Sequence, residues 1–261
     1  YLTDNTAFYF WSTMALRIIV LSYAEKRHQP PKKEIWKPKS RAEMQEQIRS
    51  MMQEGLRGGE NQMKTPGISF VIPVYNMERY LPRVIQCLKA QTMPGFEAIF
   101  VNDGSRDNSL AICKSAASED PRFRIIDQPN KGVAKARNAA LDAARGKYVC
   151  FLDPDDWVES DMAQVLYEAA KKENADIVMF GIYNDYCDKN GNCVKTLIDG
   201  PALCGVYRGK PFQEYFDALA SSYLVITKML RRACIEAAHL RFPERTLGED
   251  GLFYVAFMRQ N

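Results

Sequence analysis

From Ile68 onward, short runs of apolar residues alternate with segments in which apolar residues recur every three or four positions. The runs are typical of buried strands, whose two faces are both covered. They predict strands at residues 68–72, 98–101, 124–126, 148–152 and 176–181. Strands that are apolar over nearly their whole length indicate a mostly parallel sheet.

The segments between the predicted strands have the spacing of amphipathic helices. In the first of them Asn76 is expected to cap a helix, and the apolar residues of that helix share one face. The others predict helices at residues 107–117, 133–144 and 160–172. Repeated strand and helix units indicate an α/β fold with a doubly wound sheet flanked by helices. In such folds ligands bind at the carboxyl ends of the strands.

Residues 1–65 differ from the rest of the chain in pattern and in charge. They carry 11 basic and 7 acidic residues, whereas residues 66–261 carry 24 and 25. The apolar stretch 6–23 is interrupted by Arg17, so it is too short to span a membrane and is expected to form a packed or interfacial helix. We therefore divide the chain into a helical N-terminal appendage with a linker, residues 1–65, and an α/β domain, residues 66–261.

Two further segments of the appendage have recognisable patterns. Residues 28–39 contain prolines among lysines and are expected to form an extended linker. Residues 41–56 place methionines and other apolar residues at helical spacing. This second segment either docks on the main domain or binds a membrane surface or a partner, and the mixed charges of its polar face favour docking.

The composition narrows the classes of function. Apolar residues make up 46% of the chain and charged residues 26%, as in ordinary globular proteins. The net charge of +3 comes without a dense basic stripe, which argues against nucleic-acid binding. Only two histidines, His28 and His239, are present, so a multi-histidine metal site is excluded and carboxylates must carry most of any chemistry.

The seven cysteines are scattered and form no C-x-x-C pair. This usage fits a reducing compartment rather than a disulfide framework. Cys187 and Cys193 flank Asn190-Gly191, a pair of residues that favours a hairpin turn. The two cysteines are therefore expected to face each other across a hairpin.

Polar residues follow four successive predicted strands. They are Tyr75-Asn76, Asn102-Asp103-Gly104, Asn130-Lys131-Gly132 and Asp153-Pro154-Asp155-Asp156. Any one of these segments could be a simple turn or helix cap. The carboxyl ends of parallel strands share one edge of the sheet. Polar segments after four such strands therefore predict a binding site at that edge.

Asp153, Asp155 and Asp156 place three carboxylates within four residues. Carboxylates so close together repel one another unless a cation or hydrogen-bond donors compensate them. Oxygen ligands suit Mg²⁺ or Mn²⁺, which commonly bind through one or two carboxylates and the phosphates of a substrate. The alternative is that the acidic residues stabilise the N-terminus of the next helix, which explains one of the three well and the others poorly.

Two other phosphate-binding motifs are absent from the sequence. No G-x-G-x-x-G follows a predicted strand. Residues 205–210 have too few positions between their glycines for a P-loop, and Pro211 stands where Ser or Thr is needed. These absences argue against kinases and dinucleotide-binding dehydrogenases.

Seven motifs resemble, in order and spacing, those of glycosyltransferase family 2, whose members have the GT-A fold. The first four are Ile72-Pro73-Val74-Tyr75-Asn76, Val101-Asn102-Asp103-Gly104-Ser105, the segment from Asn130-Lys131-Gly132 to Arg137-Asn138, and Phe151-Leu152-Asp153-Pro154-Asp155-Asp156. The last three are Thr227-Lys228-Met229-Leu230, Arg241-Phe242-Pro243 and Gly248-Glu249-Asp250-Gly251. Each motif is weak alone, but their common register over residues 66–261 makes the resemblance specific.

The resemblance implies a metal-dependent, inverting glycosyltransferase that acts in bacterial surface polysaccharide or lipopolysaccharide synthesis. It would move a hexosyl or N-acetylhexosaminyl group from a UDP-sugar to a hydroxyl of a saccharide or a lipid-linked saccharide. The implied donor-binding residues are Pro73, Tyr75, Asp103, Arg137 and Asp153. Asp155 and Asp156 would bind Mn²⁺ or Mg²⁺, Asp250 would be the general base, and Glu249 would help to orient the substrates. Inversion needs only one base near the acceptor hydroxyl, so no histidine is required.

The resemblance is incomplete in two respects. The Gln-x-x-Arg-Trp motif of processive members is absent, and Asn261 falls within the helix expected after Asp250, so the C-terminus is expected to be truncated. A truncated, non-catalytic module that binds a nucleotide sugar is therefore the alternative. A nucleotidylyltransferase is less favoured, because no Gly-rich loop follows the first strand. The expected location is the cytoplasm, with peripheral attachment to the inner face of the membrane through the N-terminal region.

Overall fold

The computed structural model describes residues 9–14, 19–22, 65–187, 193–199, 205–208, 223–244 and 248–260. The predicted linker at residues 28–39 and the predicted helix at residues 41–56 lie outside this part of the chain. No helix among the described residues is long and apolar enough to cross a membrane.

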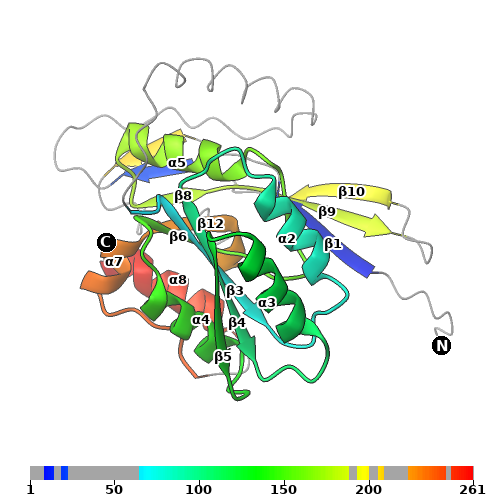
Figure 1. Cartoon of the computed structure of the whole chain (residues 1–261). Coiled ribbons are helices and arrows are strands. Elements are labelled where there is room, and N and C mark those ends of the chain that lie inside the picture. The colour runs from blue at the N-terminus through cyan, green and yellow to red at the C-terminus, as the bar shows by residue number, and fades with distance from the viewer. Residues whose placement is uncertain are drawn as a thin grey trace, which may run out of the picture.

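The larger sheet has the strand order β11-β2-β8-β12-β6-β3-β4-β5 (Figure 1). Its parallel centre consists of β3 (Ile68–Val74), β4 (Phe96–Asp103), β5 (Phe123–Gln128) and β6 (Tyr148–Phe151). The remaining strands are β8 (Ile177–Met179), β12 (Lys228–Arg231), β2 (Ile19–Ser22) and β11 (Gly205–Arg208). The predicted mostly parallel, doubly wound sheet is thus confirmed, with the antiparallel strand β12 inserted between β6 and β8.

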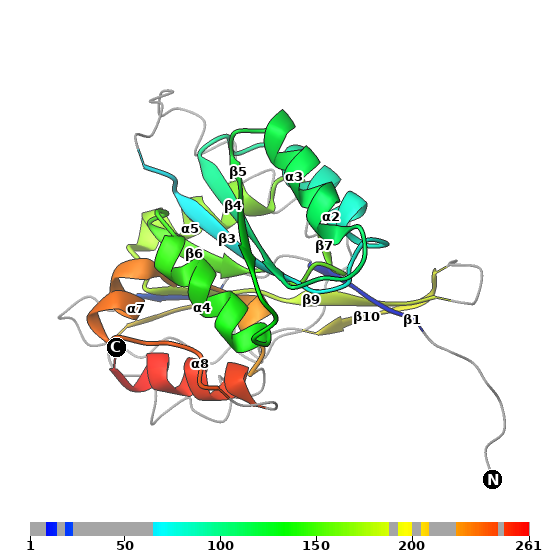
Figure 2. The same ribbon diagram turned by 60° about the horizontal axis from the view of Figure 1, so that its bottom comes forward.

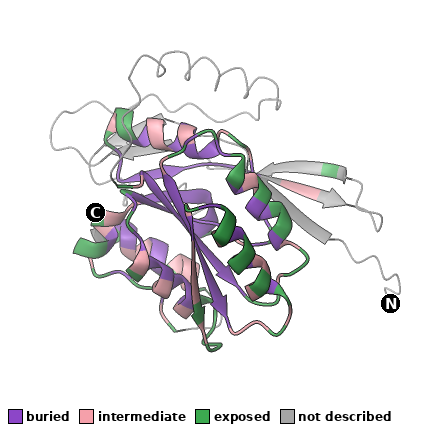
Figure 3. Ribbon diagram, in the orientation of Figure 1, coloured by how far each residue is buried: buried purple, intermediate pink, exposed green. Residues whose placement is uncertain are grey.

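The central strands are mostly apolar because helices cover both faces of the sheet. Every residue of β3, β4 and β6 is buried, and these strands form the core seen in Figure 3. The helices are α2 (Leu81–Lys89), α3 (Ser109–Glu119), α4 (Val133–Ala143), α5 (Met162–Glu173), α7 (Arg232–Ala237) and α8 (Glu249–Gln260). In Figure 2, α2 and α3 lie on one face of the sheet and α4 and α8 on the other.

The prediction of a helix at residues 6–23 is wrong. Two short strands form there instead, β1 (Tyr9–Met14) and β2, and β2 pairs with β8 at the margin of the larger sheet. Both strands consist mainly of aromatic and β-branched residues, which favour extended backbone over helix. The N-terminal segment therefore contributes strands to both sheets.

A smaller sheet has the order β10-β9-β1-β7. Its hairpin joins β9 (Ile182–Cys187) to β10 (Cys193–Asp199), and β7 (Trp157–Val158) pairs with β1 on the opposite side. Cys187 and Cys193 are register partners in the hairpin, which confirms the predicted pairing of these positions.

The prediction that Asn76 caps the first helix is also wrong, because α2 begins only at Leu81. Asn76 has a positive φ of 53° and lies in the loop before the helix. Its Oδ1 accepts a hydrogen bond from the backbone N–H of Arg106 at 2.8 Å, and its own N–H donates to Ser105 Oγ at 3.1 Å. Asn76 therefore ties the loop after β3 to the loop after β4.

The strand order places a topological switch point at β3. The chain moves from β3 to β4 and β5 on one side, and then returns to β6 on the other side of β3. The loops that follow β3 and β6 consequently leave in opposite directions, which opens a crevice at their carboxyl ends. These are the loops that begin with Tyr75 and Asp153.

A buried ion pair stabilises the opposite, amino-terminal end of the strands. The Glu97 carboxylate accepts hydrogen bonds from Ser69 Oγ at 2.7 Å, from the Arg145 backbone N–H at 2.6 Å and from Arg124 at 2.8 Å. Burial alone would raise the pKa of Glu97, but these donors outweigh it and hold the pKa below its usual value. The cluster therefore stabilises the fold only while Glu97 is ionised.

We expect Glu97→Gln to lower the free energy of unfolding by about 2 kcal/mol at pH 7, because one amide oxygen replaces two charged acceptors. Because the pKa of Glu97 is lowered in the folded state, its ionisation stabilises the fold at pH values above its unfolded-state pKa. This stabilisation is lost as the pH falls through the folded-state pKa. The difference between wild type and variant should therefore shrink toward pH 3 in urea unfolding. Glu119→Gln is the matched control: its exposed pair with Lys89 should leave stability nearly unchanged, and an equal loss there would contradict the role of burial.

Candidate active site

Arg137 of α4 joins three acidic residues at the carboxyl edge of the sheet. Its guanidinium contacts Asp250 Oδ1, donates to Asp153 Oδ1 at 3.2 Å and lies 3.5 Å from Glu249 Oε1. The Arg137 side chain is only 5% exposed, whereas those of Asp153, Glu249 and Asp250 are 35%, 14% and 19% exposed. One buried cation thus holds carboxylates from the loop after β6 and from the first turn of α8.

Asn138, the next residue of α4, fixes α4 to the segment before α8. Its side-chain amide donates to Phe242 O at 2.9 Å and accepts from Phe242 N–H at 2.8 Å. The Phe242 ring stacks on Phe253 of α8 with centroids 4.1 Å apart, and the Arg137 guanidinium lies over Phe242 at 5.4 Å from the ring centre. These contacts bring the segments Arg137-Asn138 and Arg241-Phe242-Pro243 together in the fold.

The environment of Asp250 suits a proton acceptor. Burial raises the pKa of its carboxyl group, and the nearby Asp153 and Glu249 charges add to the increase, while Arg137 opposes it. The second oxygen, Oδ2, faces the backbone N–H of Val225 at 3.5 Å. A carboxylate with a raised pKa is a stronger base than one in water, so Asp250 can take a proton from a substrate hydroxyl.

Asp103 lies at the end of β4, where it organises the loop that leads into α4. It is 3% exposed, and its carboxylate accepts hydrogen bonds from the backbone N–H groups of Lys131 and Gly132 at 2.9 and 2.8 Å. Gln128 Nε2 donates to the same carboxylate at 2.7 Å. Three donors leave little acceptor capacity for a ligand, so Asp103 mainly shapes the loop around the site.

Gly104 makes that arrangement possible. Its φ of +69° is a conformation that side chains rarely adopt, and a Cβ at this position would lie 2.7 Å from the Asn130 backbone nitrogen. The loops after β4 and β5 can therefore approach each other only because residue 104 is a glycine.

Pro73 and Tyr75 hold different positions at the end of β3. Pro73 is buried within β3. The pairing of β3 with β6 ends before this residue, so the missing N–H of Pro73 costs no hydrogen bond between these two strands. Tyr75 follows in the loop and is 41% exposed, as an aromatic side chain available to a planar ligand would be. Of the two, only Tyr75 offers a side chain at the surface of the rim.

The loop after β6 separates its acidic residues. Asp156 is buried, and its N–H donates to Asp153 O at 3.1 Å, which closes a turn. Asp155 is exposed at the rim, where partial desolvation and the neighbouring Asp153 charge raise the pKa of its carboxyl group. No three His, Cys, Asp or Glu side chains are grouped for metal binding in the described part of the chain. Asp153 is paired with Arg137, whereas Asp155 is exposed beside it, and the Asp155 carboxylate fits a cation whose remaining ligands come from a substrate.

Sequence patterns assigned no role to Lys228 or Val225. The Val225 N–H faces Asp250 Oδ2 at 3.5 Å, and the Asp250 charge acts on Lys228. Lys228 is completely buried on β12, and Val225 belongs to the 3₁₀ turn η1 (Val225–Thr227) that precedes this strand. The spacing of residues around Lys228 indicates no particular function. Only the resemblance to the family motif Thr227-Lys228-Met229-Leu230 drew attention to this segment. Charge patterning alone would have placed Lys228 on the surface.

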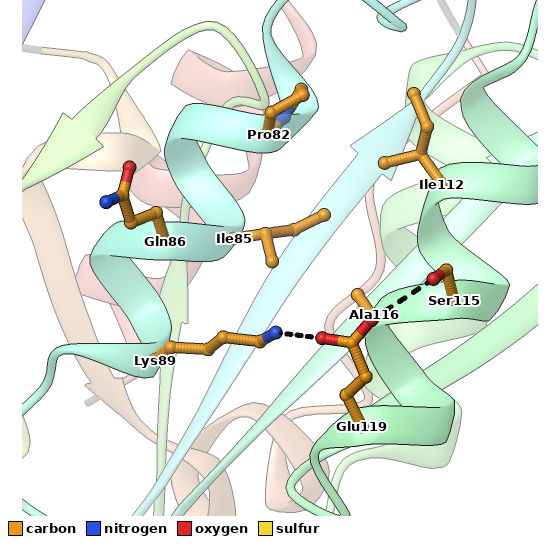
Figure 4. A pocket seen from close by; sticks show the side chains of 8 residues that line it. All are labelled: Pro82, Ile85, Gln86, Lys89, Ile112, Ser115, Ala116 and Glu119. Atoms are coloured by element: carbon orange, nitrogen blue, oxygen red, sulfur yellow. Dashed lines mark hydrogen bonds and ion pairs between the residues drawn. The ribbon is translucent and has the colours of Figure 1, made fainter.

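A groove between α2 and α3 lies apart from this edge of the sheet (Figure 4). It has a volume of about 420 Å³, its floor includes Ile85 and Ile112, and the Lys89–Glu119 ion pair bridges the two helices at one end. None of the residues that line it belongs to the Arg137 cluster. The candidate active site is therefore the rim formed by the loops after β3, β4 and β6 and by the start of α8.

Comparison with known proteins identifies the family of this fold and rim. The model of "Glycosyl transferase family 2" matches residues 69–220. The uncharacterized glycosyltransferase EpsJ of Bacillus subtilis is 42% identical over 196 residues, which cover 75% of this chain and 57% of EpsJ. The chain spans about half the length of the curated relatives that it matches.

Two groups of solved structures share the fold. S. aureus TarS 1-349 in complex with UDP-GlcNAc aligns with a TM-score of 0.57 and 23% identity over 74% of this chain and 53% of that one. Mannosyltransferase PcManGT from Pyrobaculum calidifontis, in complex with GDP-Man and Mn²⁺, aligns with a TM-score of 0.51 and 15% identity over 80% of this chain and 57% of that one. The fold is thus of the GT-A type, and the chain belongs to glycosyltransferase family 2.

Proposed function

We propose that this chain is a metal-dependent, inverting glycosyltransferase that moves a sugar from a UDP-sugar to an acceptor hydroxyl. The observation that carries the proposal is the contact of Arg137 with both Asp153 and Asp250. This contact holds the Asp250 carboxylate, whose pKa is raised, beside the crevice where ligands bind in doubly wound folds. A base next to a donor site is the arrangement that direct displacement requires.

The donor would lie along the loops after β3, β4 and β6. The exposed Tyr75 ring can stack on the nucleobase, while Pro73 and Asp103 hold the backbone around it. Asp153 would accept a hydrogen bond from the ribose. Arg137 would face the diphosphate from behind the three carboxylates that it pairs with.

Asp155 would bind Mn²⁺ or Mg²⁺ together with the diphosphate oxygens, with Asp156 beside it supporting the turn. The metal ion would neutralise the negative charge that develops on the departing nucleoside diphosphate. Asp250 would remove the proton of the acceptor hydroxyl as that oxygen attacks the anomeric carbon, and Glu249 would help to orient the acceptor. The sugar–phosphate bond breaks on the opposite face, so the configuration inverts.

The acceptor side of the rim is more apolar than the donor side. Tyr223, Leu224 and Leu252 are 48%, 44% and 48% exposed. Leu252 follows Asp250 in α8, and the other two residues precede the 3₁₀ turn whose Val225 N–H faces Asp250. A Cβ at Gly251 would lie 3.5 Å from the Tyr223 ring, so this ring packs beside the first turn of α8. Sugar rings bind such surfaces through their C–H faces, which supports a saccharide or lipid-linked saccharide acceptor in a surface polysaccharide pathway.

Two further features support details of the proposal. TarS is described with UDP-GlcNAc and the mannosyltransferase with GDP-Man and Mn²⁺, which favours a hexose or N-acetylhexosamine donor and a divalent cation. Cys87, Cys113, Cys150 and Cys234 are free thiols, which supports a reducing, cytoplasmic location.

We expect UDP to bind at least tenfold more tightly with Mn²⁺ than with EDTA, because Asp155 would hold the metal ion and the ion would offset the negative charge of the diphosphate. Asp155→Asn should remove most of this difference in isothermal titration calorimetry. Asp142→Asn, at an exposed ion pair on α4, is the matched control and should behave like wild type. No UDP binding at millimolar concentration would refute the proposal. UDP binding without donor hydrolysis or transfer, under any metal, would favour the non-catalytic module.

A further inference from the structure

Lys228 is a fully buried residue on β12, and it contacts both the turn that faces Asp250 and helix α8. Its Nζ donates to Leu224 O at 2.7 Å and to Thr227 Oγ1 at 3.0 Å. The same ammonium group lies 4.3 Å from the centre of the Tyr254 ring. Lys228 therefore connects the 3₁₀ turn before its own strand with helix α8.

Both elements that Lys228 connects also position the Asp250 carboxylate. The turn presents the Val225 N–H to Asp250 Oδ2 at 3.5 Å, and the Leu224 carbonyl that accepts from Lys228 directly precedes that N–H. Tyr254 lies four residues after Asp250 on α8, so the two residues are neighbours on one side of the helix. Lys228 thus connects the turn that faces Asp250 with the second turn of α8.

Packing alone does not account for a lysine at this position. Burial of an ammonium group costs several kcal/mol, and an apolar side chain of similar size would fill the same space without that cost. Burial lowers the pKa of Lys228 to about 7, and the negative charge of Asp250 opposes the decrease. Since the coupling between two charges is reciprocal, the Lys228 cation favours the ionised form of Asp250.

We propose that Lys228 is a positioning residue for Asp250, which holds the 3₁₀ turn and the start of α8 around the carboxylate of the base. This inference rests on the proposed role of Asp250 in sugar transfer. Four charged groups would then define the field at Asp250: Arg137 from α4, Asp153 from the loop after β6, Glu249 from α8 and Lys228 from β12. Arg137 and Lys228 favour its ionised form, and the two carboxylates oppose it.

The test compares Lys228→Met with wild type in three measurements. Carbon-13 NMR titration of the Asp250 carboxyl group, assigned with Asp250→Asn, should show a higher midpoint in the variant because a neighbouring cation is lost. Turnover in sugar transfer should fall on the order of tenfold to a hundredfold, since the base is misplaced. The Kd for UDP with Mn²⁺ should stay within about twofold of wild type, because the contacts through which Lys228 would act are with the turn before β12 and with α8.

Arg231→Met is the matched control on the same strand. Arg231 also contacts backbone carbonyls, including Ala175 O at 2.7 Å, and an aromatic ring, that of Tyr148 at 5.4 Å, but it lies at the other end of β12 from Lys228. This variant should lower the melting temperature without moving the Asp250 titration. If Lys228→Met does not fold, Tyr254→Leu, which removes the ring under the ammonium group together with the hydroxyl that contacts Met179 Sδ at 3.6 Å, should give a smaller shift in the same direction.

An unchanged Asp250 midpoint with unchanged turnover, in whichever of the two variants folds, would overturn the inference. A parallel loss of UDP binding and turnover in folded Lys228→Met would also overturn it, because it would indicate general damage to the site. The titration does not require activity. If wild type fails to transfer sugar while the Asp250 midpoint still shifts in Lys228→Met, the proposed function fails and the positioning contact stands.

Discussion

Replacement of Asp250 by Asn is expected to reduce the rate of sugar transfer by about 10²- to 10⁴-fold, the usual contribution of a general base. Asparagine has nearly the shape of aspartate and can keep a contact with Arg137 through its amide oxygen, but it cannot accept the proton of the acceptor hydroxyl. The Kd for UDP with Mn²⁺ should change little, because the donor loops remain intact. Initial rates with the UDP-sugar selected by a Mn²⁺-dependent hydrolysis screen, together with calorimetry, measure both quantities.

The dependence of turnover on pH tests the role of Asp250 in a second way. Asp250 must be ionised to act as a base, and burial raises its pKa. Turnover in wild type should therefore increase with pH through that raised pKa, on the acidic limb of the profile. The residual activity of Asp250→Asn should lack this limb.

Glu249→Gln is the matched control for the Asp250 variant. Both residues lie in the first turn of α8 and near Arg137, but the Glu249 oxygen is 3.5 Å from the guanidinium while Asp250 makes the shorter contact. We expect a smaller loss of turnover and a retained acidic limb. Wild-type turnover in Asp250→Asn would contradict the assignment of the base.

The central sheet could be predicted from the sequence because its strands are apolar on both faces. That pattern located β3, β4, β5, β6 and β8 to within a few residues, and it distinguished them from the amphipathic helices between them. It missed β12, which has only four residues and begins with Lys228 and Met229. A strand so short, with a charged residue that becomes buried by tertiary contacts, has no local signature.

The candidate site was predictable as a set of strand ends but not as a set of contacts. The coincidence of polar residues after four strands located the rim, and the family motifs added Asp250. The contact between Arg137 and Asp250 spans 113 residues and depends on how α8 packs against α4 through Phe242 and Phe253. Periodicity along the chain does not encode such a distance, and for the same reason the hydrogen bonds of Asp103 to its neighbouring loop were not foreseen.

Replacement of Arg137 by Met is expected to lower the free energy of unfolding by about 3 kcal/mol at pH 8, near the lower end of the cost of breaking a buried ion pair. The variant leaves Asp153, Glu249 and Asp250 together without their shared cation. The Asp153 side chain is 35% exposed and contributes less than the other two, because solvent screens it. Urea unfolding followed by circular dichroism measures the change.

The loss of stability in Arg137→Met should become smaller as the pH falls. Without Arg137, burial and the neighbouring carboxylates raise the folded-state pKa of Asp250 further above its unfolded value. The folded variant then binds more protons than the unfolded chain, so its stability increases as the pH falls. The difference between wild type and Arg137→Met should accordingly be smaller at pH 5 than at pH 8.

Two further variants separate the charge of Arg137 from its shape. Arg137→Lys keeps a cation but cannot reach Asp153 and Asp250 at once, so it should recover part of the stability and little of the transfer activity. Arg241→Met removes an exposed arginine that pairs with Asp142 and should have only a small effect. An equal loss of stability in Arg137→Met at pH 5 and pH 8 would mean that Arg137 stabilises the fold by packing over Phe242 rather than by neutralising the three carboxylates.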